Sequence, residues 1–207
     1  MITVIAGVNG AGKSSVIGSR FRSDGGDYFN PDEVTRSLLV NNPSLTLEEA
    51  NGAAWKMGFD LLQDAINKDQ DYTFETTLGG NSICSLLLKA AKAGINIRII
   101  FVGLDSPEKH IRRVAARVAK GGHDIPEKKI RERWYGAIAN LMSLIPVCSA
   151  IAVFDNSTEL VDGLPSPLRL FVMKGDEFVI PPRPDIPEWA KPLAVVAIKR
   201  NAGVLQG

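Results

Sequence analysis

A glycine-rich segment near the start of the chain has the residue types and spacing that indicate chemistry. Residues 7–14 read Gly-Val-Asn-Gly-Ala-Gly-Lys-Ser and match the Walker A pattern G-x-x-x-x-G-K-[ST]. In this pattern the glycines let successive backbone N–H groups point at a phosphate, and the next helix presents its positive N-terminal end to the same anion. The segment therefore predicts a phosphate-binding loop (P-loop) for a nucleoside triphosphate.

The residues of this loop have separate expected roles. Lys13 is expected to reach the β- and γ-phosphates, and the Ser14 hydroxyl is expected to hold Mg²⁺. ATP and Mg²⁺ are therefore the predicted cofactors. The expected ATP contacts in the loop are Gly7, Asn9, Gly10, Ala11, Gly12, Lys13, Ser14 and Ser15.

Two acidic residues follow predicted strands and are candidates for contact with a phosphoryl acceptor. Asp32 follows a predicted strand at 27–30, and Glu75 lies at the end of a predicted strand at 72–76, beside the hydroxyls of Thr76 and Thr77. Strand ends form the binding edge of an open α/β sheet, so Asp32 could accept a proton from an acceptor hydroxyl or orient that hydroxyl. The alternatives are that Asp32 only stabilises a helix start and that Glu75 is a solvated loop acid.

The segments after the P-loop disfavour two types of P-loop protein. GTPases and motors usually carry a hydrophobic strand ending in Asp, or a D-x-x-G segment. Neither feature occurs after the P-loop in this sequence.

A basic helical stretch at about 106–133 is predicted to form a lid over the phosphates. In the helix expected at 106–120, Arg113, Arg117 and Lys120 share one face. Arginine suits a transferring phosphoryl group because its forked charge matches the spread oxygens. A solvated basic face is the alternative interpretation.

A second lid helix is expected at 126–144, after the flexible segment 121–126. Its Arg131 and Arg133 are two residues apart and therefore project about 200° apart, so only one of them can face the same phosphate as Arg117. His123, in the flexible segment, is more typical of a hydrogen-bonding residue than of a metal ligand or base.

Strands and helices alternate along the first three quarters of the chain, which predicts an α/β architecture. We expect a three-layer P-loop NTPase or nucleotide-kinase-like fold with a five-stranded, mainly parallel sheet. By analogy with nucleotide kinases, the expected strand order is 27–30, 72–76, 2–6, 95–102 and 150–154. Residues 1–160 would form the kinase core. Residues 161–207 would form a C-terminal appendage with a hairpin at 168–180 and a helix at 187–199, both packed on the core.

The composition of the chain disfavours a nucleic-acid-binding protein and a membrane protein. The chain has 207 residues, and 24 Lys and Arg against 23 Asp and Glu give a net charge of +1, so a generally basic nucleic-acid binder is not indicated. No run of about 18 apolar residues predicts a transmembrane helix, and the N-terminus lacks the charged region of a signal peptide, so a cytoplasmic protein is expected. Cys84 and Cys148 lie in apolar segments and are predicted to be reduced core residues.

The ordered set of these segments resembles the zeta-toxin family of P-loop kinases. The resemblance covers roughly residues 1–157. The segments that carry it are 7–14, Phe29-Asn30-Pro31-Asp32, Phe74-Glu75-Thr76-Thr77-Leu78, Arg117 with 121–126, Arg131-Glu132-Arg133-Trp134 and Asp155-Asn156-Ser157. Residues 160–207 match no segment of that family.

The resemblance implies an ATP-dependent kinase that phosphorylates the 3′-hydroxyl of the amino sugar in UDP-N-acetylglucosamine. It also implies a small antitoxin protein as partner. By this resemblance Lys13 and Ser14 hold ATP and Mg²⁺, Asp32 is the base, Arg117 and either Arg131 or Arg133 clamp the phosphates, and Asn156 lies near the adenine. The expected acceptor-binding residues are Asn30, Asp32, Glu75, Thr76 and Thr77.

Three other functions remain open from the sequence. The P-loop serves a kinase for another hydroxylated metabolite or an antibiotic equally well. A binding module that uses ATP only as a switch would need the same loop. A nucleic-acid end kinase is disfavoured by the near-zero net charge.

Overall fold

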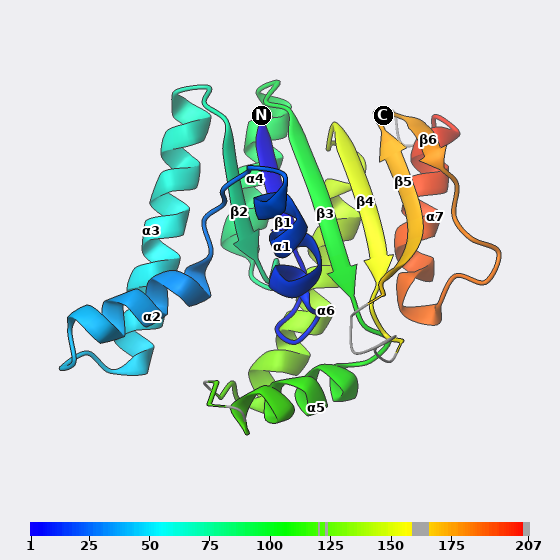
Figure 1. Ribbon diagram of the computed structural model, residues 1–207. Coiled ribbons are helices and arrows are strands. Elements are labelled where there is room, and N and C mark those ends of the chain that lie inside the picture. The colour runs from blue at the N-terminus through cyan, green and yellow to red at the C-terminus, as the bar shows by residue number, and fades with distance from the viewer. Residues whose placement is uncertain (120, 123, 159–165, 205–207) are drawn as a thin grey trace.

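A six-stranded sheet with the order β2-β1-β3-β4-β5-β6 forms the centre of the protein (Figure 1). The computed structural model describes residues 1–119, 121–122, 124–158 and 166–204, so the expectations for Lys120, His123 and a boundary near residue 160 lie outside the described residues. The strands are β1 (Ile2–Ala6), β2 (Tyr72–Thr76), β3 (Ile97–Gly103), β4 (Ala150–Asp155), β5 (Leu168–Lys174) and β6 (Glu177–Ile180). The first four are parallel, whereas β5 and β6 are antiparallel to their neighbours.

The fold class predicted from the sequence is confirmed. The observed sheet differs from the predicted one in two details. The segment 27–30 lies beside β2, where its strand is expected, but it makes only one bridge, between Phe29 and Phe74. Asn30 and Pro31 begin the next helix at once, which leaves no length for a strand. The hairpin expected at 168–180 is present, and β5 pairs with β4, so the sheet has six strands and not five.

Helices lie on both faces of this sheet. In the view of Figure 1, α1 lies in front of the sheet and α4 and α6 lie behind it, while α5 lies below the ends of the parallel strands. The helical elements are η1 (Ser14–Gly18), α1 (Ser19–Ser23), α2 (Pro31–Asn41), α3 (Leu47–Asn67), α4 (Asn81–Lys92), α5 (Pro107–Val118), α6 (Glu127–Leu144), η2 (Glu188–Ala190) and α7 (Lys191–Asn201). No helix within the described ranges combines the length and apolar character that a membrane crossing requires.

Local sequence signals explain where several helices begin. The Asn30 side chain accepts a hydrogen bond from the Asp32 backbone and caps α2, and Pro31 occupies the first turn. Thr46 and Glu49 form the predicted capping box of α3, because the side chain of each bonds the backbone N–H of the other. The Asn30 cap and Pro31 fix the first turn of α2, which carries Asp32.

One hydrophobic core joins the sheet to the helices behind it. It combines fully buried side chains such as Ile99 and Phe101 of β3 with Leu87 of α4 and Leu141 of α6. Cys84 and Cys148 are buried and free, as predicted. A core of this kind holds the strand ends rigidly relative to one another.

The sheet register brings the loops after four strands to one edge. Ala6 at the end of β1 pairs with Thr76 of β2 and Phe101 of β3, and Gly103 of β3 pairs with Asp155 of β4. In α/β sheets this carboxyl edge is where ligands bind. The P-loop, Glu75 and Asn156 therefore meet at one end of the molecule.

Candidate nucleotide and acceptor site

The P-loop follows β1 and is formed as its sequence pattern predicts. Gly7 follows the strand, and a Cβ added there would lie 2.2 Å from the backbone oxygen of Val102, so only glycine fits. Gly12 has a φ of +88°, which favours glycine, and a Cβ there would lie 2.7 Å from the Asn156 amide nitrogen. The glycines thus leave the backbone of the loop free of side chains at the two positions where it packs most tightly, as a phosphate-binding loop requires.

Lys13 and Ser14 both contact Glu75 of β2. Lys13 Nζ lies 3.4 Å from Glu75 Oε1, and the side chains of both residues are only 7% exposed. Ser14 Oγ donates a hydrogen bond of 2.8 Å to Glu75 Oε2. The two residues expected to hold ATP and Mg²⁺ are therefore bound to one buried carboxylate.

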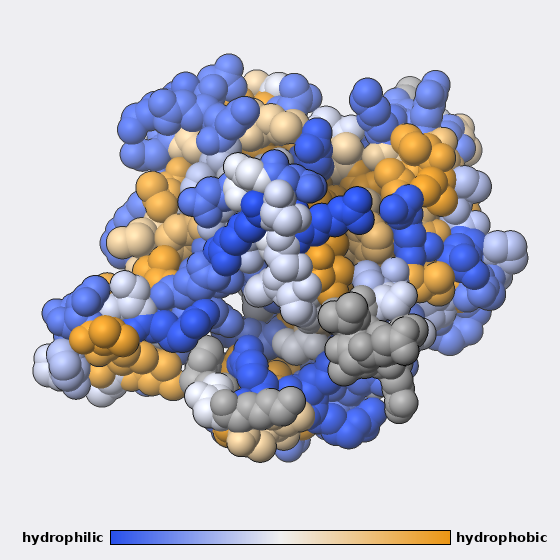
Figure 2. Space-filling model, in the orientation of Figure 1, coloured by the Kyte–Doolittle hydropathy of each residue, from blue (hydrophilic) through white to orange (hydrophobic). Residues whose placement is uncertain are grey.

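A cleft of about 1360 Å³ opens beside the P-loop, between α2 and α5, and we call it the nucleotide cleft. In the space-filling view the surface is hollowed between the regions of α2 and α5 (Figure 2). Within the described part of the chain, its walls include Gly10, Gly12, Ser15, Asn156 and one acid, Asp32. The cationic side chains that line it are Arg36, Lys109, Arg112, Arg113 and Arg117. Such a wall attracts a polyanion such as a triphosphate.

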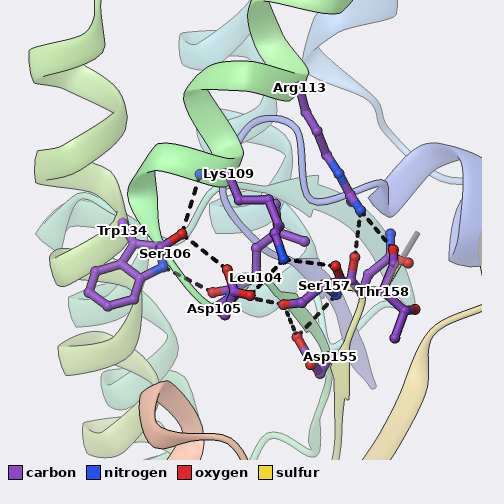
Figure 3. A network of polar contacts seen from close by, with 10 residues as sticks. Leu104, Asp105, Ser106, Lys109, Arg113, Trp134, Asp155, Ser157 and Thr158 are labelled. Atoms are coloured by element: carbon purple, nitrogen blue, oxygen red, sulfur yellow. Dashed lines mark hydrogen bonds and ion pairs between the residues drawn. The ribbon is translucent and has the colours of Figure 1, made fainter. Parts of the chain in front are cut away.

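Residues 156–158, which follow β4, are hydrogen-bonded to α5 (Figure 3) and line one side of this cleft. Arg113 donates hydrogen bonds of 2.7 Å and 3.3 Å to the backbone oxygens of Asn156 and Thr158. Lys109 pairs with Asp105 at 2.6 Å and donates to the Ser157 backbone oxygen at 2.9 Å. Burial lowers the pKa of the Arg113 guanidinium. Arg113 thus holds the cleft wall.

Asn156 lies against the P-loop itself. Its side chain is 3% exposed, and Nδ2 donates a hydrogen bond of 2.8 Å to the Ala11 backbone oxygen. It also lines the nucleotide cleft. These contacts place Asn156 at the edge of the cleft, next to the P-loop.

A second cavity of about 650 Å³ adjoins the first, and we call it the acceptor cavity. Its aromatic wall consists of Phe29, Trp55, Phe59 and Phe74. The rings of Trp55 and Phe59 are stacked, with centroids 5.3 Å apart and planes 20° apart. Its charged side chains are Asp32, Glu48, Glu75, Asp124, Lys129 and Arg133. Apolar walls with a few placed polar groups are typical of small-molecule sites.

Asp32 lines both cavities. It lies in the first turn of α2, and its Oδ2 is 3.8 Å from Arg117 Nη1 of α5. The carboxylate therefore stands at the junction of a cationic cleft and an aromatic cavity. A proton acceptor between two bound reactants needs this position.

The structure places Arg133, and not Arg131, beside the P-loop. Arg133 Nη1 donates a hydrogen bond of 2.8 Å to Asn9 Oδ1, and burial lowers its pKa while the Asp32 carboxylate opposes that shift. Arg131 is half-exposed, is hydrogen-bonded to Glu108 of α5 and lines neither cavity. Of the two arginines that project about 200° apart on α6, Arg133 is therefore the one that faces the P-loop.

Other sequence-predicted acceptor residues shape the site through local bonds. Asn30 caps α2 and lines neither cavity. Thr76 and Thr77 line the acceptor cavity, and their hydroxyls accept hydrogen bonds from the backbone N–H groups of Leu78 and Gly79, at 3.1 Å and 3.5 Å. Both hydroxyls therefore help to form the turn that follows β2.

This turn is held by Asn140 of α6. Leu78 has a φ of +55°, which is uncommon outside glycine, and its side chain is fully buried. Asn140 Nδ2 donates to the backbone oxygens of Leu78 and Gly80 at 2.8 Å and 3.0 Å. These bonds offset the strain and fix the wall of the acceptor cavity.

His110 connects α5 to the P-loop and was not identified from the sequence. Its side chain is fully buried, Nδ1 lies 2.8 Å from the Asn9 backbone oxygen, and Nε2 has no hydrogen-bond partner among the described residues. Burial lowers the pKa of His110 to about 4. The imidazole is therefore neutral at pH 7 and donates from Nδ1 to the loop.

The other lining residues that were not identified from the sequence include five cationic or aromatic ones that flank the two sites. They are Arg36, Lys109 and Arg112 in the nucleotide cleft, and Trp55 and Phe59 in the acceptor cavity. Trp55 and Phe59 are four residues apart on α3, which is the spacing of an ordinary core stripe. Arg36 follows Asp32 by one helical turn, so it could have been found from the same face of α2.

The chain belongs to the AAA_33 family, described as "AAA domain". The sequence profile of this family matches residues 2–134, which is more than half of the chain. An uncharacterized protein of Haemophilus influenzae is 30% identical over 129 residues, covering 62% of this chain and 88% of that protein. The family match includes the P-loop, α5 and the start of α6.

Solved structures share the fold at low sequence identity. AvrRxo1-ORF1:ORF2 with ATP superposes with a TM-score of 0.65 at 13% identity, covering 95% of this chain. This chain spans only 63% of the length of that chain. A structure of the PezAT chromosomal toxin-antitoxin system of Streptococcus pneumoniae gives a TM-score of 0.55 at 13% identity, covering 100% of this chain and 86% of the other. The chain therefore has an α/β P-loop fold of the kinase-like type.

Proposed function

We propose that this protein is an ATP-dependent kinase that transfers the γ-phosphoryl group of ATP to a hydroxyl of a small molecule. The observation that carries the proposal is the position of Asp32, which lines both the cationic nucleotide cleft and the acceptor cavity. A protein that only bound ATP would not need a carboxylate between two adjoining cavities. The resemblance of the motifs to zeta toxins supports the same reaction.

The P-loop side of the site fits Mg-ATP. Glycine backbone surrounds the phosphate position, Lys13 is buried with its ammonium at the loop, and the Ser14 hydroxyl is oriented by Glu75. Mg²⁺, when bound with ATP, neutralises charge on the β- and γ-phosphates. Lys13 would exchange its pairing with Glu75 for the phosphates, and Asn156 would contact the nucleotide at the edge of the cleft.

The acceptor side fits a hydroxyl that attacks the γ-phosphorus. Asp32 would accept the hydroxyl proton as the new P–O bond forms and the bond to the β-phosphate oxygen breaks. Arg117 lies 3.8 Å from Asp32, and Arg133 is held at Asn9 of the P-loop. Both guanidinium groups would stabilise the charge that spreads over the transferring phosphoryl oxygens.

UDP-N-acetylglucosamine is the acceptor that the zeta-toxin resemblance implies, and we propose it as the first compound to test. A small antitoxin that holds the kinase in check belongs to the same proposal. The fold similarity to the PezAT structure, a toxin-antitoxin system, supports the search for such a partner.

A second candidate acceptor is an uncharged or cationic hydroxylated metabolite or antibiotic. One observation favours it. Among the described residues, acidic side chains outnumber basic ones in the acceptor cavity, with Asp32, Glu48, Glu75 and Asp124 against Lys129 and Arg133. Such a wall attracts an amine more strongly than a diphosphate. The aromatic face of Trp55 suits a sugar or amino-sugar ring in either case.

ADP release in the presence of Mg-ATP, measured over a panel of acceptors, tests the proposal. The panel should contain UDP-N-acetylglucosamine, simple sugars and aminoglycosides, with a Lys13→Ala variant as the control. Acceptor-dependent ADP release that the variant lacks is the expected result. ATP binding without acceptor-dependent turnover would indicate a nucleotide-gated binding module instead.

A further inference from the structure

Asn9, the third residue of the P-loop, lies on the acceptor side of the site. It lines the acceptor cavity, whereas Gly10 and Gly12 of the same loop line the nucleotide cleft. The sequence predicts a contact with ATP for Asn9. Its place in the wall of the acceptor cavity indicates a role toward the acceptor as well.

Both oxygen atoms of Asn9 accept hydrogen bonds from the lid helices. His110 of α5 donates from Nδ1 to the Asn9 backbone oxygen, at 2.8 Å. Arg133 of α6 donates from Nη1 to the side-chain oxygen Oδ1, also at 2.8 Å. A guanidinium group can only donate, so the atom of the amide that faces it is the oxygen and not the nitrogen. Arg133 therefore fixes the orientation of the Asn9 amide.

The amide nitrogen of Asn9 is the polar group that remains. Nδ2 carries two protons, and no acceptor among the described residues takes either of them. Asn9 is nevertheless only 8% exposed. Leaving a buried donor without an acceptor costs about 1–3 kcal/mol, so such a group in a folded protein requires an explanation. Because Asn9 lines the acceptor cavity, a molecule bound there can accept these protons.

The other walls of the cavity limit what this molecule can be. Asp32 lines the same cavity and is the proposed acceptor of the proton from the attacked hydroxyl. The stacked rings of Trp55 and Phe59 form an apolar face that suits a sugar ring. A molecule that uses all of these groups presents one hydroxyl to Asp32 and a second oxygen to Asn9.

We propose that Asn9 determines acceptor specificity, with Nδ2 donating a hydrogen bond to a second oxygen, hydroxyl or carbonyl, of a polyhydroxylated acceptor. This role rests on the proposed function, because it requires that a hydroxylated molecule is phosphorylated in the acceptor cavity. A site built to hydrogen-bond an oxygen of its substrate rejects analogues that lack it, since the buried group is then left unpaired. The acceptor class is therefore sugars and their derivatives rather than alcohols with a single oxygen.

The groups around Asn9 also select an oxygen over an amine at this position. Asn9 Nδ2 and the Arg133 guanidinium both donate and neither accepts, so an ammonium group would find no partner there. Amino groups elsewhere on the same molecule remain compatible with the acids of the cavity.

The experiment measures kcat and KM by steady-state ADP release from Mg-ATP. The acceptor is UDP-N-acetylglucosamine or, if that compound is not phosphorylated, the sugar or aminoglycoside of the panel with the fastest release. For Asn9→Ala we expect the KM for the acceptor to rise by about 10- to 100-fold. The KM for ATP should change much less. Asn67→Ala removes an exposed amide that lines neither cavity, and both of its KM values should equal those of the unaltered protein.

Arg133→Ala separates a direct contact of Asn9 with the acceptor from an effect through Arg133. If Nδ2 contacts the acceptor, adding Asn9→Ala to Arg133→Ala should raise the KM for the acceptor further, by about tenfold or more. A double variant with the acceptor KM of Arg133→Ala alone would show that Asn9 only holds Arg133, and would overturn the proposal.

Acceptor analogues that each lack one oxygen identify the recognised atom. For one analogue, Asn9→Ala and the unaltered protein should have the same KM, because the contact is already missing. An equal rise in KM for every analogue would contradict the contact. If Asn9→Ala does not fold, Asn9→Asp keeps an oxygen for Arg133 but has no N–H to donate, and the same rise in the acceptor KM is expected.

The outcomes separate the role of Asn9 from the proposed function. Turnover of an acceptor with a KM that does not depend on Asn9 would overturn this role and leave the kinase activity standing. Absence of acceptor-dependent ADP release by the unaltered protein would overturn both.

Discussion

Arg133 of α6 donates a hydrogen bond of 2.8 Å to the side chain of Asn9, which joins the second lid helix to the P-loop across 124 residues of sequence. The bond fixes a guanidinium at the nucleotide side of the acceptor cavity. A charge held in place before the reaction stabilises developing charge without reorganisation. Arg133 is therefore the arginine of α6 that we assign to the phosphates.

Replacing Arg133 by alanine should lower kcat by about 10²- to 10³-fold, because one donor to the transferring phosphoryl group is lost. Arg131→Ala is the matched control, since Arg131 is on the same helix but bonds to Glu108 at the surface. Its kcat should change less than about twofold. Steady-state ADP release measures both variants, and equal losses would contradict the assignment.

Asp32→Asn should lower kcat by about 10²- to 10⁴-fold, because the amide cannot accept the hydroxyl proton. The Kd for Mg-ATP should change much less than kcat, because the P-loop residues expected to hold the phosphates are unaltered. Single-turnover kinetics and calorimetry separate the two effects. A folded variant with an unchanged chemical rate would remove Asp32 from the mechanism.

The buried imidazole of His110 should make the fold less stable at low pH. Its pKa is about 4 in the folded protein, below the ordinary 6.5, because burial disfavours the charged form. The unfolded chain then binds the proton more readily, so stability is lost as pH falls from about 6.5 to 4. The contribution of this residue is about 2–3 kcal/mol.

Urea unfolding at pH 7 and pH 4 measures this effect. His110→Asn keeps a donor for the Asn9 oxygen, because its Nδ2 takes the position of His110 Nδ1, but it does not titrate. The variant should therefore lose about 2–3 kcal/mol less free energy of unfolding between the two pH values than the unaltered protein. Equal losses would show that His110 is not the group responsible.

Trp55→Ala should raise the KM for the acceptor by about tenfold and leave the KM for ATP unchanged, because its ring lines only the acceptor cavity. Met57→Ala is the control, since Met57 is similarly exposed on the same helix and lines neither cavity. If the Trp55 variant kept the KM of the unaltered protein for its acceptor, the aromatic wall would have no role in acceptor binding.

The parts of the fold that could be predicted from sequence depend on local signals. The P-loop needs only a buried strand, glycines at fixed positions and a helix, all within residues 2–23. The capping box at Thr46 fixes the start of α3 without reference to other elements. The hairpin at 168–180 could also be predicted from its own residues. Its pairing with β4 could not, because no local sequence signal specifies which strand the hairpin joins.

The parts that could not be predicted depend on long-range geometry. The choice between Arg131 and Arg133 is set by the rotation of α6 against α5 and the P-loop. The Ser14–Glu75 bond depends on the register between β1 and β2, which are 65 residues apart in the chain. Trp55 and Phe59 have the spacing of core residues, and only the packing of α3 against α2 and β2 turns them into a cavity wall.

The most direct test of the proposed phosphoryl transfer is mass spectrometry of a reaction that contains the protein, Mg-ATP and UDP-N-acetylglucosamine, extended afterwards to the wider acceptor panel. We predict the gain of one phosphoryl group on a small-molecule acceptor, and no gain with Lys13→Ala. Phosphorylated UDP-N-acetylglucosamine would establish the acceptor that the motifs imply. ATP binding with no phosphorylated product from any acceptor of the panel would contradict the conclusion that this site transfers a phosphoryl group.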